Sequence, residues 1–279
     1  MSRDAENLEQ ILNSTFGLAF LTHLLDLQPH PILIGAVSAG EIPKRAEEFR
    51  LRHLKRPLFE IFAEFIRDYP FGLTHDWIRL SEELRSSKDE LGFVLSKAAP
   101  ELVNLGFTSG FEATNQFAVL SDAYSQTEKY ETLWKPNAGA WWTHPNTLPT
   151  FQALSDDLKN FAIDDAMVSP TSMTKYSPVV SSKVFEIHSV EEWLKLVAEF
   201  PLETEILHLE NWLFSYDPHR ASIWAPDWRK VAKQYGGVYL SPAAYLGASY
   251  AFLELPDGRI TFLSGWSPGT TFWLPQASS

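Results

Sequence analysis

The sequence predicts an α+β fold, in which a helical N-terminal part is followed by a mixed, mainly antiparallel sheet with flanking helices. Apolar residues recur every three or four positions in the first part, as on one face of a helix. Short alternating segments, helix-capping signals and a turn follow in the second part. Nine of the ten tryptophans also lie at residue 134 or later. We therefore expect a helical domain over 1–110 and an α+β domain over 111–279.

The overall composition excludes several classes of protein. The 279 residues contain 23 Lys+Arg and 35 Asp+Glu, a net charge of −12, and no cysteine. A strongly acidic chain does not bind phosphate backbones through its bulk charge, and without cysteine there is no disulfide or thiolate metal site. No apolar run reaches the roughly 18 residues of a membrane span. The first ten residues are acidic, unlike the basic start of a secretory signal, so we expect a cytoplasmic protein without membrane contact.

The first part is expected to contain four or five helices. Apolar residues over 8–24 are spaced as on one helical face. Pro43 suits the first turn of a second helix, whose apolar face continues over 51–65 and is interrupted by Pro57.

Two capping signals indicate where the next helices begin. Thr74 can cap a short helix that runs from Trp77 to Leu84. Ser87 and Glu90 are spaced as a capping box ahead of an apolar run.

The second part begins its regular structure with an alternating segment. Over 183–188, Val184, Glu186 and His188 point one way and Phe185 and Ile187 the other, as in a strand. Another capping box follows immediately, Ser189 with Glu192, and predicts a helix.

The remaining elements are predicted from turn and stop signals. Pro226-Asp227 opens a helix through Tyr235, Gly236-Gly237 stops it, and a strand over 238–240 follows. Pro256-Asp257-Gly258 joins segments 250–255 and 259–263 into a hairpin, and 270–274 is a last strand. The Ser-, Thr- and Pro-rich segment 164–182 is expected to be a long loop.

The standard motif for a di-metal carboxylate site is incomplete in this sequence. Glu205-x-x-His208 occurs once, whereas a di-metal carboxylate site needs it twice, so no metal site is expected. Six basic residues over 44–56 form either a solvated helix face or a docking site for phosphate or an acidic partner.

The most informative stretch is Leu133 to Pro145, which holds three tryptophans together with Lys135, Thr143 and His144. Two interpretations remain open at this point. The indole rings can be core anchors beneath a loop, or they can form the wall of a concave site for a planar ring.

The residues from about 133 to 275 resemble a loosely defined set of uncharacterised bacterial and phage proteins. The similarity follows a shared order: a Lys-Pro-x-Gly element with Trp, a strand and helix, an Asp-Trp helix that leads to a strand, and a closing strand with Trp. In this chain the matching residues are Lys135-Pro136, Gly139, Trp141 and Thr143, then 184–196, then Asp227–Ala232 and Tyr235–Leu240, then Gly265-Trp266 and Thr271–Leu274. One extra residue separates Pro136 from Gly139.

The Gly139 to Thr143 stretch is also similar to the central strand of the ADP-ribosyltransferase superfamily, where such a stretch lines the nicotinamide pocket. The resemblance implies that the chain uses NAD as a cofactor to modify a macromolecular target, either a protein or a nucleic acid. Trp141 or Trp142 would stack on nicotinamide, with Lys135 and His144 beside them. Thr143 would hold the ribose and Glu254 would act as the catalytic acid.

The chain departs from the superfamily in its closing segment, which carries Ser267-Pro268-Gly269-Thr270 without an acidic residue. Glu254, on the preceding predicted strand, is the nearest substitute. The alternative is a non-catalytic interaction protein of the immunity or adaptor type. Its acidic surface would steer basic partners and its tryptophans would anchor an interface.

Overall fold

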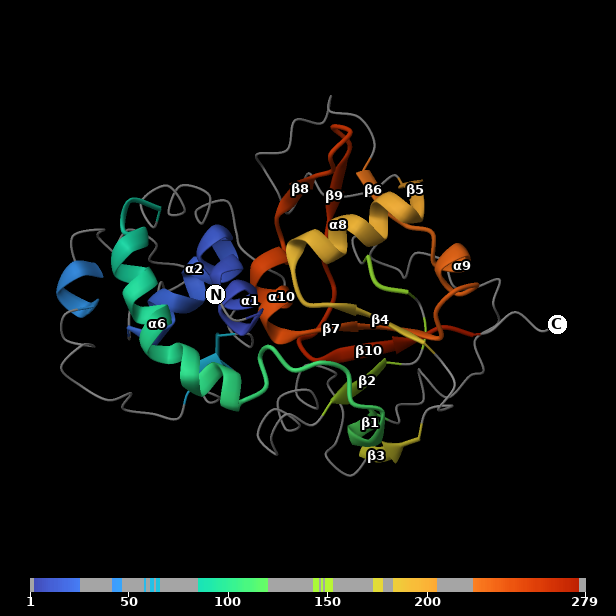
Figure 1. The fold of residues 1–279 in the computed structure, drawn as a ribbon, viewed down its shortest axis with the longest axis horizontal. Coiled ribbons are helices and arrows are strands. Elements are labelled where there is room, and N and C mark those ends of the chain that lie inside the picture. Colours follow the sequence, from blue (N-terminus) through green and yellow to red (C-terminus); the bar gives the residue numbers. More distant parts are fainter. Residues whose placement is uncertain are drawn as a thin grey trace.

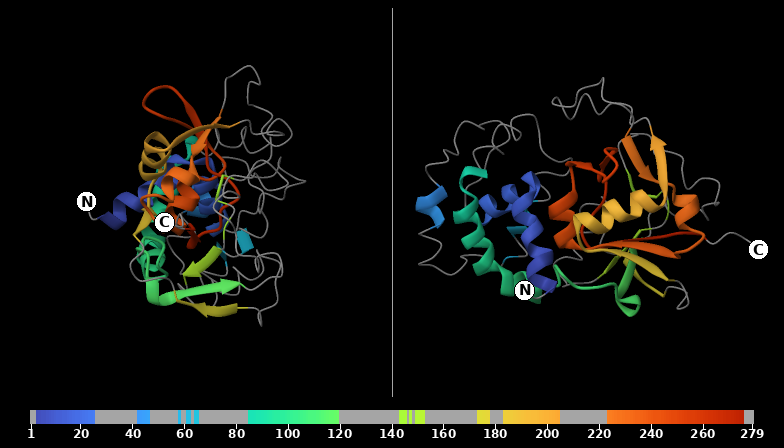
Figure 2. Two further views of the ribbon diagram at one scale, coloured as in Figure 1. Left: turned by 90° about the vertical axis from the view of Figure 1, so that its right-hand side faces the viewer. Right: turned by 45° about the horizontal axis from the view of Figure 1, so that its top comes forward.

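The computed structural model describes residues 3–25, 42–46, 58, 61–62, 64–65, 85–119, 143–145, 147, 149–152, 173–177, 183–204 and 223–275. Within these residues the fold is α+β, as predicted: helices form one side of the molecule and two sheets form the other (Figure 1). The right-hand view of Figure 2 separates the same helical and sheet-containing sides.

The first segment is not one continuous helix. Helix α1 covers Arg3–Glu9, a 3-10 turn η1 covers Gln10–Asn13, and helix α2 covers Thr15–Leu24. The break falls at Ser14, whose backbone is extended and whose Oγ accepts a hydrogen bond from the Gly17 amide. The periodic residues are buried except for the half-buried Leu12, but α2 is buried on every side from Phe16 to Leu24, and a local N-cap divides the segment.

Helix α6 covers Lys88–Asn104 and starts after Ser87, as expected. The predicted capping box is absent, because the Ser87 side chain makes no capping hydrogen bond. Residues 42–46 are helical around Pro43, also as expected. The predicted helix after Thr74 lies outside the described residues.

The main sheet has the strand order β3-β1-β2-β10-β7-β4. Among the described strands β4 and β7 run parallel and the other neighbours are antiparallel. The strands are β1 (Gln116–Val119), β2 (Pro149–Gln152), β3 (Met173–Tyr176), β4 (Val184–Ile187), β7 (Gly237–Leu240) and β10 (Thr270–Trp273).

Strand β3 lies within 164–182, so the expectation of a loop is wrong for its four residues. These residues form a strand because they pair with β1, a partner that the local sequence does not predict.

A smaller sheet has the order β5-β6-β9-β8 and contains the predicted hairpin. Gly258 turns that hairpin with a φ of 84°, in the left-handed region that glycine adopts without strain. Its strands are β5 (Pro201–Thr204), β6 (Ile223–Pro226), β8 (Phe252–Glu254) and β9 (Ile260–Phe262).

Three further helices connect the strands. Helix α8 (Val190–Glu199) begins at Ser189, whose Oγ accepts the Glu192 amide as predicted. Helix α9 (Trp228–Val231) is capped by Asp227 and is shorter than expected. Helix α10 (Pro242–Ala248) follows β7 directly, and the short 3-10 turn η2 (Ala113–Asn115) precedes β1. In Figure 1, α8 covers one side of β4 and β7, and α10 lies between that sheet and the N-terminal helices.

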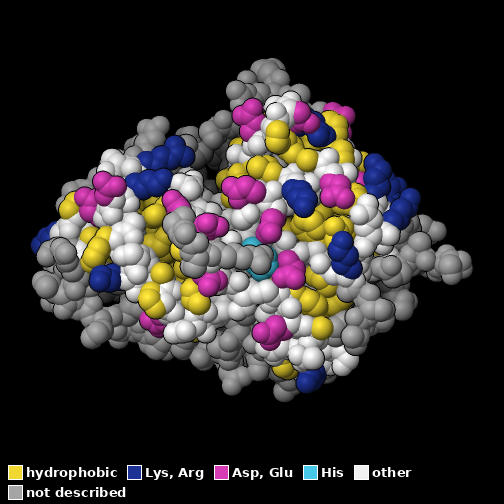
Figure 3. Space-filling model, viewed as in Figure 1, with side chains coloured by type: hydrophobic (Ala, Val, Ile, Leu, Met, Phe, Trp, Pro, Cys, Tyr) yellow, Lys and Arg dark blue, Asp and Glu magenta, His cyan; other side chains and the backbone are white. Residues whose placement is uncertain are grey.

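On the face shown in Figure 3, acidic side chains gather near the middle and basic ones lie mostly toward the edges. None of the helices in the described ranges combines the length and the apolar character that crossing a membrane requires.

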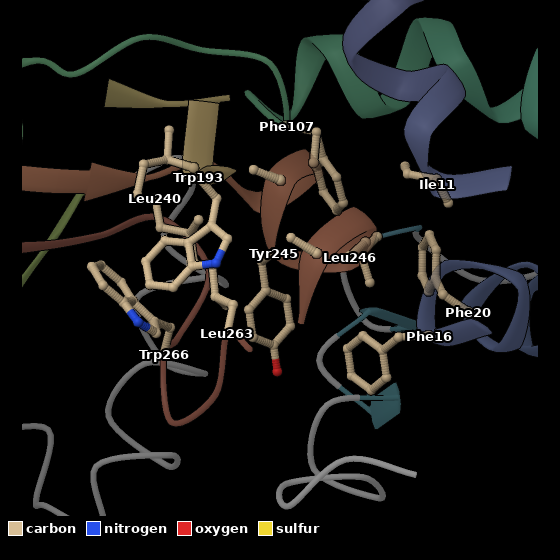
Figure 4. Close-up of a cluster of buried hydrophobic side chains, with 14 of the residues drawn as sticks. Ile11, Phe16, Phe20, Phe107, Trp193, Leu240, Tyr245, Leu246, Leu263 and Trp266 are labelled. Carbon is tan, nitrogen blue, oxygen red and sulfur yellow. The ribbon is translucent and has the colours of Figure 1, made fainter. Parts of the chain in front are cut away.

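One hydrophobic core runs from the N-terminal helices into the main sheet. Tyr245 of α10 lies at its middle, between Phe16 on one side and Trp193 and Trp266 on the other (Figure 4). The ring centroids of Phe16 and Tyr245 are 5.5 Å apart in an edge-to-face arrangement. The expected boundary near residue 110 lies just after the last N-terminal helix, α6, and the core continues across it. A division into two domains stays a prediction.

Candidate functional site

The two faces of the main sheet differ in chemistry. Strand register places Glu186, Tyr239, Thr271 and Thr150 in one row across four strands, so their side chains share a face. The neighbouring row on the opposite face contains Phe185, Val238 and Phe272, which belong to the core. The sheet thus buries an apolar face and carries a polar one, which we call the polar face.

A carboxylate lies at one end of this row and is held by two partners. Oε2 of Glu186 accepts a hydrogen bond from the Phe111 amide at 2.9 Å and lies 2.9 Å from Nε2 of His188. A Cβ atom at Gly110 would come within 3.0 Å of the same oxygen, so glycine allows segment 109–111 to approach the carboxylate closely. The side chain of Glu186 nevertheless remains 38% exposed, which leaves it within reach of a ligand.

His188 is fixed at several atoms. Its backbone N–H donates to Oε2 of Glu192 and its backbone carbonyl accepts from Nε2 of Gln10. The imidazole is 5% exposed, and no described residue gives its Nδ1 atom a hydrogen-bond partner. A neutral imidazole that donates from Nε2 to a carboxylate carries its lone pair on Nδ1. The contacts therefore favour one tautomer and one ring orientation.

Tyr239 provides a neutral hydroxyl beside this pair. Its Oη donates to the Ser109 carbonyl at 3.2 Å. Burial raises the pKa of the phenol, and the negative charges of Glu186 and Glu112 raise it further. Tyr239 therefore stays protonated and acts as a hydrogen-bond donor over the physiological pH range.

Aromatic rings line the polar face next to the carboxylate. The centroid of Trp273 lies 5.7 Å from that of Phe111 and 5.4 Å from that of Tyr176, and all three rings are half-buried. The Trp273 indole is held by a 2.8 Å hydrogen bond from Nε1 to Oγ1 of Thr150. Partly exposed rings beside a fixed carboxylate are the combination that a site for a polar ligand with a planar ring requires.

A row of amide side chains secures the segment that crosses the polar face. Oγ1 of Thr150 donates to Oε1 of Gln116 at 2.6 Å, and Nε2 of Gln116 donates to Oε1 of Gln152 at 3.3 Å. Gln152 in turn binds the Gly110 carbonyl and the Glu112 amide, at 2.9 and 2.8 Å. This network holds segment 110–112 against β1 and β2, so the Phe111 amide is aimed at Glu186 before any ligand arrives.

The residues predicted from the tryptophan-rich stretch lie elsewhere. Thr143 is buried, and its Oγ1 donates to the Ser264 carbonyl at 3.1 Å and accepts the Ser264 amide at 3.0 Å. The His144 ring stacks on Phe272 at 4.5 Å, against the apolar face. Burial lowers the pKa of His144 to about 4, partly offset by its hydrogen bond with the Pro145 carbonyl. Both side chains serve packing and pairing in these positions.

The predicted acid Glu254 is exposed at the end of β8, where it pairs with Ile260. Thr143 binds Ser264, four residues beyond Ile260 along the chain, a span of roughly 13 Å if extended. The described contacts therefore do not join Glu254 to Thr143. Lys135, Trp141 and Trp142 lie outside the described residues, as do Glu205 and His208 and most of the basic cluster over 44–56. The part of the chain that the structure describes contains no cluster of three metal-ligating side chains.

Sequence reasoning did not assign a role to Glu186, His188, Tyr239 or Trp273. The alternation over 183–188 placed Glu186 and His188 on one face, which was the available signal. Nothing local indicates that Phe111, 75 residues earlier, donates to the same carboxylate.

Comparison with protein-family models, curated proteins and solved structures finds no match for this chain.

Proposed function

We propose that the chain is an ADP-ribosyltransferase-like enzyme that uses NAD to modify a macromolecular target, with the polar face as its site. One observation carries the proposal. The Glu186 carboxylate, held by His188 and the Phe111 amide, is partly exposed beside the half-buried rings of Phe111 and Trp273.

The chemistry of the reaction explains why this arrangement suits it. Cleavage of the bond between nicotinamide and ribose develops positive charge on the sugar, as glycoside cleavage does. A carboxylate that is already fixed stabilises that charge without reorganising during the reaction. In this proposal Glu186 has the role that the family resemblance gave to Glu254, and His188 positions it.

The neighbouring groups would bind the rest of the nucleotide. The rings of Phe111, Trp273 and Tyr176 offer stacking surfaces for a planar heterocycle. Trp141, Trp142 and Lys135 remain predicted contacts of the cofactor. Thr143 and His144 are retained as structural support, because their polar atoms already bind Ser264 and Pro145.

The proposal is tested by measuring NAD-induced stabilisation and nicotinamide release. A ligand at 100 times its Kd stabilises a protein by about 2.7 kcal/mol, which a melting assay detects. We expect Glu186→Gln to retain this stabilisation by NAD but to lose nicotinamide release. The amide carries no negative charge that could stabilise the positive charge developing on the sugar. Glu254→Gln is the matched control and should release nicotinamide at the wild-type rate.

Two outcomes would overturn the proposal. If millimolar NAD does not change the melting temperature, NAD is not the cofactor. If Glu186→Gln releases nicotinamide at the wild-type rate, the polar face is not the active site. If Glu254→Gln alone is inactive, the earlier assignment of the acid to Glu254 is the correct one.

A second candidate function is an acidic interaction protein. Glu112 and Glu186 both lie near enough to Tyr239 to raise its pKa, and acidic side chains gather on the face shown in Figure 3. With a net charge of −12, such a surface would attract a basic partner. Binding of a basic peptide that weakens with salt and with Glu112→Gln, together with no response to NAD, would favour this function.

A further inference from the structure

Gln10 joins the N-terminal helices to the candidate site through both ends of its side-chain amide. It lies in η1 and is buried. Its Nε2 donates to the His188 carbonyl at 2.6 Å and to the Asn7 carbonyl at 2.6 Å, and its Oε1 accepts the Val190 amide at 2.9 Å. A single side chain thus bridges the bend between β4 and α8.

That bend sets the position of His188. The histidine's backbone N–H is held by Glu192 of α8, its carbonyl by Gln10 and its imidazole by Glu186. Among these, the bond from Gln10 is the one that comes from the N-terminal helices, 178 residues away in sequence. The geometry of the Glu186–His188 pair therefore depends on where η1 is placed.

The amide at position 10 is chemically specific for this task. The bend presents one carbonyl and one N–H to the same buried side chain, so a residue there must both donate and accept. Glutamate would place an oxygen against the His188 carbonyl, and methionine would leave both backbone groups unpaired. Helix α10 leaves room for the side chain at Gly247, where a Cβ would come within 2.7 Å of Cγ of Gln10.

We infer that Gln10 is a positioning residue, through which the N-terminal helices control the orientation of His188 and hence of the Glu186 carboxylate. The part of this inference that concerns activity rests on the proposed function. The part that concerns the histidine does not, because it is observed on the imidazole itself.

The test compares Gln10→Met and Gln10→Glu with wild type and with Ser14→Ala. Oγ of Ser14 donates to the Leu246 carbonyl at 2.6 Å and accepts the Gly17 amide at the start of α2. Its loss also weakens the attachment of the N-terminal helices but leaves the hydrogen bond from Gln10 to His188 in place. The ring nitrogens of His188 are followed by NMR in the full-length protein. We expect wild type and Ser14→Ala to show mainly the tautomer protonated at Nε2, and both Gln10 variants to show a mixture of tautomers.

Enzymatic activity provides the second measurement of this test. If nicotinamide release is found, Gln10→Met should lower kcat about tenfold or more with KM for NAD little changed, because misplacing a catalytic group affects the chemical step. If Gln10→Met does not fold, Gln10→Glu and Gly247→Ala, which presses on Cγ of Gln10, replace it. Unchanged His188 signals in a folded Gln10 variant would overturn the inference. Altered signals in a chain that does not respond to NAD would support it and count against the proposed function alone.

Discussion

His144 illustrates how a single residue's surroundings decide its role. Burial lowers its pKa from the ordinary value of 6.5 to about 4, and its ring stacks on Phe272. The unfolded chain therefore binds a proton more readily than the folded chain between these two pH values. The contribution of His144 to the free energy of unfolding is complete above pH 6.5 and is lost as the pH falls toward 4.

We predict that the free energy of unfolding falls between pH 7 and pH 5 by about 2 kcal/mol on account of this histidine. The measurement is urea unfolding at both pH values for wild type and for His144→Gln. The variant should lose about that much of the pH dependence because it cannot take up the proton. An equal pH dependence in the two proteins would show that His144 titrates normally.

At the scale of elements, the junction of η1 and α2 depends on a close backbone approach. A Cβ at Gly17 would clash with the Ile11 carbonyl oxygen, a backbone atom that cannot move aside without opening the turn. Gly92, within α6, differs: among the described residues, its Cβ would meet only Cδ1 of Leu12, at an ordinary 3.6 Å.

We predict opposite effects of the same substitution at these two glycines. Gly17→Ala should lower the free energy of unfolding by about 3 kcal/mol or more through the clash. Gly92→Ala should raise it by about 0.5–1 kcal/mol, because alanine restricts the unfolded chain and favours the helix. Urea unfolding of both variants provides the comparison. A shift of both in the same direction would contradict the description of the junction.

At the scale of the whole molecule, the continuous core links the helices to the sheet. Phe16 of α2 packs on Tyr245 of α10, and Trp193 and Trp266 continue the same cluster toward the sheet. Partners within one apolar cluster lose their contacts together, so the described parts are expected to unfold together.

We predict a single unfolding transition in urea. Tryptophan fluorescence reports mainly on the second part, since nine of the ten tryptophans lie there, while circular dichroism at 222 nm also follows the N-terminal helices. The two midpoints should coincide. Separate midpoints would instead support independent domains with a boundary near residue 110.

The sequence by itself determined those elements whose signals are local. Ser189 and Asp227 cap the helices that their spacing predicted, and Gly258 turns the predicted hairpin. Each of these signals acts over about four residues, through a hydrogen bond or a backbone angle that the neighbouring residues set. The alternation over 183–188 likewise determined which side chains of β4 share a face.

Only the tertiary structure decided which of these faces meet. Strands β1 and β2 are four residues long, and their order in the sheet depends on backbone hydrogen bonds with partners that no nearby residue specifies. The polar face follows from that order, because Phe111, Glu186, Tyr239 and Trp273 come from four separate segments. Local sequence fixes the direction of a side chain within its own element, whereas the packing of distant elements fixes what that side chain touches.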